Sequence, residues 1–155
     1  MSTSPAAPSP APATAPGAAD EMQALFDRYG DAWASRDPSA IAPFHAPDGR
    51  FHLHAAAPEV RGRDAIEAAF AGFLAQFPDL TFTSQQALIA DWGWTVRWTM
   101  SGTLAQPLEM AGARAEPGGR IEIDAVDVIT VSDGLLTAKH TYVDWAAGLQ
   151  QLGLA

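Results

Sequence analysis

The residues of this chain best suited to acid–base chemistry are one aspartate and a set of histidines. Asp127 lies in a segment of alternating character, and the residues that share its face are apolar: Ile123, Ala125, Ile129 and Val131. A carboxyl group on an apolar face loses hydration in its charged form, which favours a role as a proton donor. We interpret Asp127 as a catalytic group. The alternative is a structural carboxylate that bonds a loop amide or pairs with an arginine.

Two histidines stand two residues apart in an earlier predicted strand. His52 and His54 share one face of this strand, whereas Phe51 and Leu53 take the other. An unperturbed imidazole titrates near ~6.5, so either histidine can act as a general base at neutral pH. Each of them can equally be a hydrogen-bonded or exposed ring with no catalytic role.

A third histidine, His140, lies in the last predicted strand and shares its face with Ala138 and Tyr142. Parity does not show which face lines the pocket; if this face does, His140 converges with the earlier pair near Asp127. An i,i+2 pair with one remote histidine also matches a three-histidine metal site. Strand alternation alone does not bring ring nitrogens to bonding distance, so we predict neither a metal nor a cofactor. His45 precedes a turn and is interpreted as a surface or capping residue.

Aromatic and apolar side chains form a stripe on a long predicted strand. Trp94, Trp98 and Met100 share one face, and Leu104 lies further along. Such a stripe is typical of a core, but the indole rings can also stack on a planar ligand. We predict that these four residues and Tyr142 contact a substrate.

Composition limits the partners of the chain. The 155 residues carry a net charge of -9, which disfavours nucleic acid and anionic membrane surfaces. There is no cysteine, so disulfides, thiolate nucleophiles and cysteine zinc sites are excluded. No apolar run reaches the ~20 residues of a membrane span, and no secretory signal is recognised. We expect a cytoplasmic protein with a small-molecule partner.

The order of predicted elements is that of an α+β domain. Residues 1–18 are almost wholly Pro, Ala, Ser, Thr and Gly and are predicted to be a disordered tail, which leaves 19–155 as one domain. Helical spacing predicts helices over 20–36, 38–44, 63–77 and 144–152. Strands are predicted over 50–54, 80–87, 89–104, 120–131 and 135–142, with a mobile loop over 109–119. The last four strands should form an antiparallel meander with helices on one face.

Five stretches of this sequence carry a resemblance to a known family. They are Arg28-Tyr29 with Ala32-Trp33 and Asp37; residues 62–66; residues 77–80; residues 98–103; and residues 126–128 through Asp133-Gly134 to Asp144 and residues 151–153. In this order and spacing the chain resembles the SnoaL-like polyketide cyclases, or ester cyclases, of the nuclear transport factor 2-like superfamily. The resemblance implies a curved antiparallel sheet that forms a cone with the N-terminal helices and encloses an apolar pocket.

The resemblance also implies roles for particular residues. Asp127 matches the acid–base aspartate of the cyclases, and Tyr29 matches a tyrosine of the oxyanion hole in ketosteroid isomerases. Leu104 stands where the cyclases usually have a histidine. The family further implies a homodimer, no cofactor, and a small hydrophobic ligand of aromatic or polycyclic type.

The expected function is a cofactor-independent enzyme that forms an enolate on a small hydrophobic carbonyl compound, as a polyketide cyclase or an isomerase does. His52 or His54 would remove a proton next to the carbonyl. Asp127 and Tyr29 would donate hydrogen bonds to the developing enolate oxygen.

Two other functions stay open on the sequence. The leucine at position 104 suggests a non-catalytic module that binds a small ligand in the same pocket. A dehydratase or hydrolase would instead use His54, His140 and Asp127 to activate a hydroxyl group or water.

Overall fold

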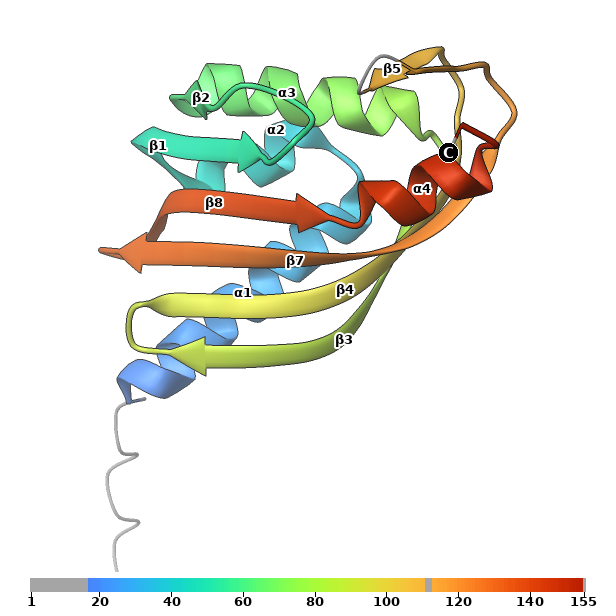
Figure 1. Cartoon of the computed structure of the whole chain (residues 1–155). Helices are drawn as coiled ribbons and strands as arrows, with labels where there is room; N and C mark the ends of the chain where they lie inside the picture. The colour runs from blue at the N-terminus through green and yellow to red at the C-terminus, as the bar shows by residue number, and fades with distance from the viewer. Residues whose placement is uncertain (1–16, 111–112, 155) are drawn as a thin grey trace, which may run out of the picture.

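A curved six-stranded sheet with helices on one of its faces forms the protein (Figure 1). The computed structural model describes residues 17–110 and 113–154. The helices are α1 (Ala18–Ser35), α2 (Pro38–Ile41), the 3-10 turn η1 (Ala42–Phe44), α3 (Arg63–Gln76) and α4 (Trp145–Gln151). The strands are β1 (His45–Leu53), β2 (Val60–Arg61), β3 (Thr81–Ala90), β4 (Gly93–Thr103), β5 (Leu108–Met110), β6 (Ala113–Ala115), β7 (Arg120–Ser132) and β8 (Leu135–Val143).

The main sheet has the strand order β2-β1-β8-β7-β4-β3. The last four long strands pair antiparallel, as predicted. The first strand differs from the prediction because β1 runs parallel to β8, which makes the sheet mixed. Strands so distant in sequence are not joined by a hairpin, so no turn forces them to be antiparallel. This parallel pair forms the wall on which the candidate site is built.

The predicted helices and the α+β class are confirmed, whereas one loop prediction is wrong. Part of the segment 109–119 forms a two-stranded ladder, in which β5 pairs antiparallel with β6. The tail predicted over residues 1–18 lies outside the described residues except for its last two positions, and Ala18 already belongs to α1. In the part of the chain that the structure describes, no helix has both the length and the apolar character needed to cross a membrane.

Helix α1 packs across the inner face of the sheet, behind the strands as drawn in Figure 1. Its buried residues Leu25, Tyr29 and Ala32 recur at three- and four-residue spacing. The helix ends at Arg36, which adopts a left-handed backbone conformation with φ 60°. The Arg36 guanidinium donates hydrogen bonds to the carbonyl oxygens of Pro78 and Leu80, so the end of α1 is fixed to the turn before β3.

Candidate functional site

A cavity of about 710 Å³ lies between the inner face of the sheet and helices α1 and α3. Its wall is mostly aromatic and aliphatic, which suits an apolar ligand. The lining residues are Phe26, Tyr29, Gly30, Trp33, Ala34, Arg36, Phe51, Leu53, Ala57, Ala69, Phe70, Phe73, Leu80, Thr81, Phe82, Ser84, Trp94, Val96, Trp98, Asp127, Ile129, Lys139, Thr141 and Val143.

The lining residues that are exposed to solvent are all small. They are Gly30, Ala34, Ala57, Thr81 and Ser84. At these positions the lining of the cavity meets solvent.

A buried ion pair stands on the cavity wall contributed by β7 and β8. Asp127 is 7 % exposed and Lys139 is 4 % exposed. The Lys139 ammonium donates a hydrogen bond to Asp127 Oδ2, and the Thr141 hydroxyl donates to Asp127 Oδ1 at 2.6 Å. Asp127 and Thr141 are directly opposite in the antiparallel register, so their side chains share the inner face. The carboxylate is thus satisfied by two donors that also line the cavity.

The Lys139 ammonium is flanked by aromatic rings from α1. Its Nζ atom lies 5.6 Å from the centroid of the Trp33 ring and 6.0 Å from that of Tyr29. A cation within about 6 Å of an aromatic face is attracted by the ring quadrupole. The aromatic rings therefore add to the carboxylate in keeping an ammonium group inside an apolar cavity.

Tyr29 and His45 form a second buried polar pair next to the ion pair. The Tyr29 hydroxyl lies 3.2 Å from His45 Nε2. Burial raises the pKa of Tyr29 well above its ordinary value, and the charge of Asp127 adds to this. Burial, together with the positive charges of Lys139 and Arg63, lowers the pKa of His45 to about 3. Both groups are therefore neutral near pH 7, and Tyr29 is placed in the cavity as predicted.

The prediction for His45 is wrong, because the ring is completely buried instead of lying at the surface. Strand β1 begins at His45, five residues before the predicted start, and His45 pairs with Leu136 of β8. The register then shifts before Arg50. The His45 ring lies on the same inner face as Phe51 and Leu53, where it meets Tyr29.

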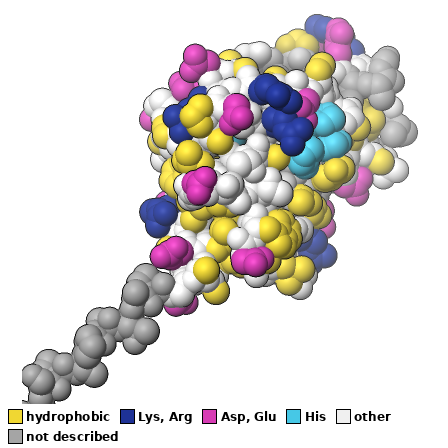
Figure 2. Space-filling view, turned by 90° about the vertical axis from the view of Figure 1, so that its left-hand side faces the viewer, with side chains coloured by type: hydrophobic (Ala, Val, Ile, Leu, Met, Phe, Trp, Pro, Cys, Tyr) yellow, Lys and Arg dark blue, Asp and Glu magenta, His cyan; other side chains and the backbone are white. Residues whose placement is uncertain are grey.

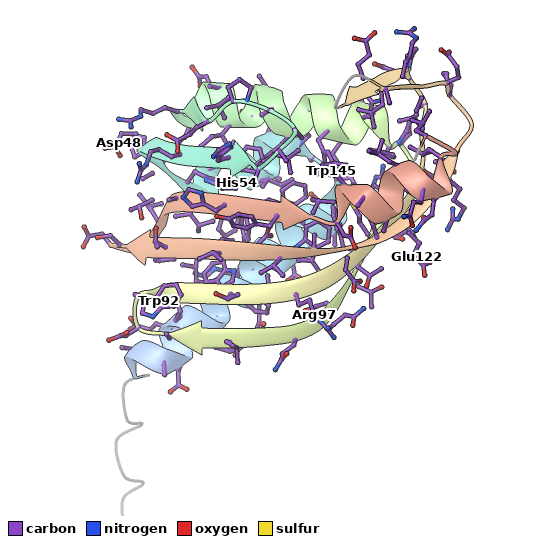
Figure 3. The ribbon with its side chains drawn as sticks, viewed as in Figure 1. Asp48, His54, Trp92, Arg97, Glu122 and Trp145 are labelled. Carbon is purple, nitrogen blue, oxygen red and sulfur yellow. The ribbon has the colours of Figure 1, made fainter. Side chains whose placement is uncertain are left out.

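The three other histidines converge, but they do so outside the cavity. His52, His54 and His140 are on the outer face of the sheet, half-buried, and none of them lines the cavity. Figure 3 shows His54 near the end of β1 on the face opposite α1, close to Trp145. The predicted meeting of these histidines with Asp127 is therefore wrong, and the dehydratase or hydrolase constellation built on it does not form one site.

Alternation along β8 does not say which of its two faces lines the cavity, and the pairing with β7 decides it. Leu136 pairs with Val131, but the next paired residue on β8 is Ala138, opposite Thr130, so Thr137 is an extra residue. The side-chain alternation reverses at this point. Leu136 points inward, and after the bulge Lys139 and Thr141 point inward while His140 points out.

The outer histidine cluster is tightly spaced. His54 Nε2 lies 3.0 Å from His140 Nδ1, and one nitrogen of each of the three rings lies within 4.8 Å of the others. Desolvation lowers the pKa of His54, with smaller contributions from the neighbouring charges of His52 and His140. The exposed Tyr142 ring stacks on His54 with 4.1 Å between the ring centroids.

The predicted substrate-binding residues fall into two groups, those that line the cavity and those that do not. Trp94 and Trp98 line the cavity. Met100 and Leu104 are buried in the core but do not line it, and Tyr142 lies on the outer face. The aromatic stripe of β4 thus serves both functions, with its first half on the cavity and its second half in the solid core.

Lys139 is the site residue that sequence reasoning missed. It is the only lysine of the chain, and it stands in a segment of otherwise uncharged residues. Solvent-facing positions elsewhere in the sequence carry arginine or acidic residues, so a lone lysine in a strand is a usable signal. Lys139 is opposite Ile129 in the register with β7, which places it on the face of Asp127.

Comparison with solved structures shows the same fold in small proteins of bacteria. A proposed SnoaL-like polyketide cyclase from Jannaschia sp. CCS1 is 17 % identical, with a TM-score of 0.76, covering 93 % of this chain and 99 % of its own. AclR from Streptomyces galilaeus, a proposed hydroxylase, is 23 % identical, with a TM-score of 0.72, and the match covers 88 % of this chain and 87 % of AclR. IdmH from Streptomyces antibioticus, a proposed polyketide cyclase, is 25 % identical, with a TM-score of 0.67 and coverage of 85 % and 98 %.

A search of curated proteins finds no match to the chain. The family model of the SnoaL-like domain, in contrast, matches residues 26–139, which span α1 to β8 and include both members of the ion pair. This family supports a small-molecule role of the cyclase or isomerase type. From the fold, the cavity and this match, the chain belongs to the SnoaL-like domain family.

Proposed function

We propose that the protein is a cofactor-independent enzyme that forms an enolate on a small, flat, hydrophobic carbonyl compound inside the cavity. The observation that carries the proposal is the Asp127–Lys139 pair, a base and an acid placed side by side on an otherwise apolar wall. An enolate-forming site needs this combination, because one group must remove a proton while another stabilises the oxygen that becomes negative.

The proposed base is the Asp127 carboxylate, which replaces the histidines expected from the sequence. Asp127 takes a proton from the carbon next to the substrate carbonyl, and the electrons of the broken C–H bond form the enolate. The enolate carbon then attacks a second carbonyl of the same molecule, which closes a ring, or it is reprotonated elsewhere, which isomerises the substrate. In either case the proton held by Asp127 returns to the product.

Lys139 and Tyr29 are the proposed donors to the enolate oxygen. The ammonium group supplies full positive charge, and Tyr29 supplies a hydroxyl group whose proton is not readily lost. If the neutral His45 carries its proton on Nε2, it donates to the Tyr29 oxygen and leaves the phenolic proton free for the substrate. His45 then positions Tyr29 from behind without touching substrate.

The flat shape of the ligand follows from the rings around the pair. Trp33, Trp94 and Trp98 all line the cavity. Indole faces favour stacking on planar, aromatic ligands. A volume of about 710 Å³ is within the range of sites that enclose drug-sized molecules, so a polycyclic substrate is compatible with the cavity.

Exchange of hydrogen for deuterium tests the proposal without knowledge of the product. Aromatic β-keto esters are incubated with the protein in D₂O, and loss of the proton between the two carbonyls is followed by NMR. Wild type should accelerate exchange, and Asp127→Asn should reduce the enzymatic rate by about 10²- to 10⁴-fold. The matched control is Arg97→Gln, which changes an exposed residue on the outer face of β4 and should leave the rate unaltered.

Binding of the same esters, followed by quenching of tryptophan fluorescence, separates lost chemistry from lost folding. Exchange by Asp127→Asn within about twofold of wild type would contradict the assignment of the base. Tight binding of these compounds by wild type with no exchange would instead identify a non-catalytic ligand-binding module.

A further inference from the structure

The outer face of the β1–β8 pair carries a cluster of imidazoles that the proposed reaction does not use. His52 and His140 are directly opposite in the parallel register, and His54 follows two residues after His52 on the same face. One ring nitrogen from each lies within 4.8 Å of the other two. Figure 2 shows histidine side chains gathered in one surface patch, so the cluster is open to solvent.

The closest contact in the cluster already has the spacing of metal ligands. In a tetrahedral zinc site with Zn–N bonds of about 2.0–2.1 Å, the nitrogen atoms are about 3.3 Å apart. His54 Nε2 and His140 Nδ1 are 3.0 Å apart. The ligand atom of His52 lies within 4.8 Å of the other two, so rotation of side chains is enough to bring the three nitrogen atoms around one ion.

The hydrogen bond between these two rings uses nitrogen atoms that a cation could bind instead. Two neutral imidazoles can share only one proton between Nε2 of His54 and Nδ1 of His140, so one lone pair is used as an acceptor and the other nitrogen must carry the hydrogen. A bound cation would accept both lone pairs, and each ring would then carry its proton on the nitrogen that faces away. The contact is converted from one hydrogen bond into two coordination bonds.

We propose that His52, His54 and His140 bind one divalent cation of the Zn²⁺, Co²⁺ or Ni²⁺ class. Imidazole nitrogen is a ligand that these ions prefer, whereas Mg²⁺ and Ca²⁺ require oxygen. Three protein ligands leave a fourth position for water or for an anion. The Glu59 carboxylate is close enough to act on the charge of His54, and its negative charge favours a cation there.

The position of this site gives it a structural role. A cation held by His52 and His54 of β1 and by His140 of β8 would link the two parallel strands on their outer face. The residues next to these histidines along the chain, Leu53 and Lys139 among them, line the cavity on the inner face. Metal binding would therefore stiffen the wall that carries the ion pair.

The test uses the full chain without a polyhistidine tag. Titration calorimetry with Zn²⁺ should give one ion per chain, and Co²⁺ should produce the visible absorption bands of a low-coordinate nitrogen site. The thermal unfolding midpoint should rise with Zn²⁺ concentration, since the ion binds the folded chain. His54→Asn and His140→Asn should each weaken Zn²⁺ binding by at least tenfold.

Arg97→Gln is the matched control, because Arg97 is an exposed residue of the same sheet face on the distant strand β4. Its Zn²⁺ affinity should equal that of wild type. Circular dichroism checks that the variants fold, and ¹⁵N NMR of the imidazoles in the unaltered chain reports which rings respond to Zn²⁺. Absence of Zn²⁺ binding by wild type, or equal binding by the histidine variants, would overturn the proposal.

Discussion

The two faces of the sheet formed by β1, β8 and β7 hold their ionisable groups in opposite ways. On the inner face, Asp127 and Lys139 are buried and are satisfied by each other and by Thr141. On the outer face, His52, His54 and His140 are half-buried and contact mainly one another. The difference shows that the buried carboxylate and ammonium groups are stabilised as a pair, whereas the half-buried imidazoles are stable at the surface without an ion pair.

Breaking the inner pair should have the largest effect on stability. Lys139→Met or Asp127→Leu alone leaves one buried charge without its partner, and each should lower the free energy of unfolding by about 3–5 kcal/mol. The double variant Asp127→Leu/Lys139→Met removes both charges and should be more stable than either single variant. Urea denaturation measures all three, and a double variant as unstable as the sum of the singles would refute the view of a coupled pair.

Lowering the pH should reduce the stability of the protein through His45, the second buried group on the inner face. Its pKa in the folded protein is about 3, below the ordinary 6.5 of the unfolded chain, so the unfolded state binds the proton first as the pH falls. The stability that this group contributes is complete above pH 6.5 and is lost as the pH falls from 6.5 toward 3. The loss is on the order of 1.4 kcal/mol per pH unit.

Urea denaturation across pH 7 to 4 measures this slope. His45→Gln keeps a polar side chain of similar reach but does not titrate, so its stability should depend less on pH in this window. An identical slope in wild type and His45→Gln would show that another group is responsible.

Removal of the Tyr29 hydroxyl should lower the free energy of unfolding by less than breaking the ion pair does. Tyr29→Phe keeps the ring and its aromatic contacts but leaves His45 Nε2 without a partner among the described residues. An unsatisfied buried polar group costs about 1–3 kcal/mol, so the unfolding free energy should fall by that amount. Denaturation at pH 7 measures it, and a change below a few tenths of a kcal/mol would mean that the hydrogen bond is not formed in solution.

Substitutions on the outer face should change the free energy of unfolding least. Without added metal, His52→Asn should change the unfolding free energy by no more than about 0.5 kcal/mol, because the side chain is only partly buried and carries no essential contact. The same denaturation experiment, with a chelator present, measures this. A loss of unfolding free energy as large as that of Lys139→Met would contradict the expected difference between the two faces.

The fold was predictable from the sequence because its signals are local. The three- and four-residue spacing in α1 and α3 marks the faces that cover the sheet, and the strict alternation of β7 identified the inner row that contains Asp127. The same spacing predicts that Tyr29 lies on the buried face of α1. The homodimer and the cytoplasmic location stay predictions.

The site was predictable only in part because two side-chain orientations are not set by local sequence. Alternation divides the side chains of β8 into two rows, and the pairing with β7 places Lys139 and Thr141 inward and His140 outward. His45 was missed because β1 begins five residues before the predicted start. Alternation along one strand cannot reveal which row faces inward, because that is set by the pairing with the neighbouring strand.

Lys139 is the only lysine of the sequence, so a reagent that labels lysine side chains reports on the cavity alone. Its Nζ atom is the one side-chain amine available to an acylating reagent or an aldehyde, and it lies on the cavity wall. The rate at which a small reagent labels this amine therefore measures how accessible the cavity is. A bound ligand would slow that labelling, which provides a screen for occupants that needs no knowledge of the reaction.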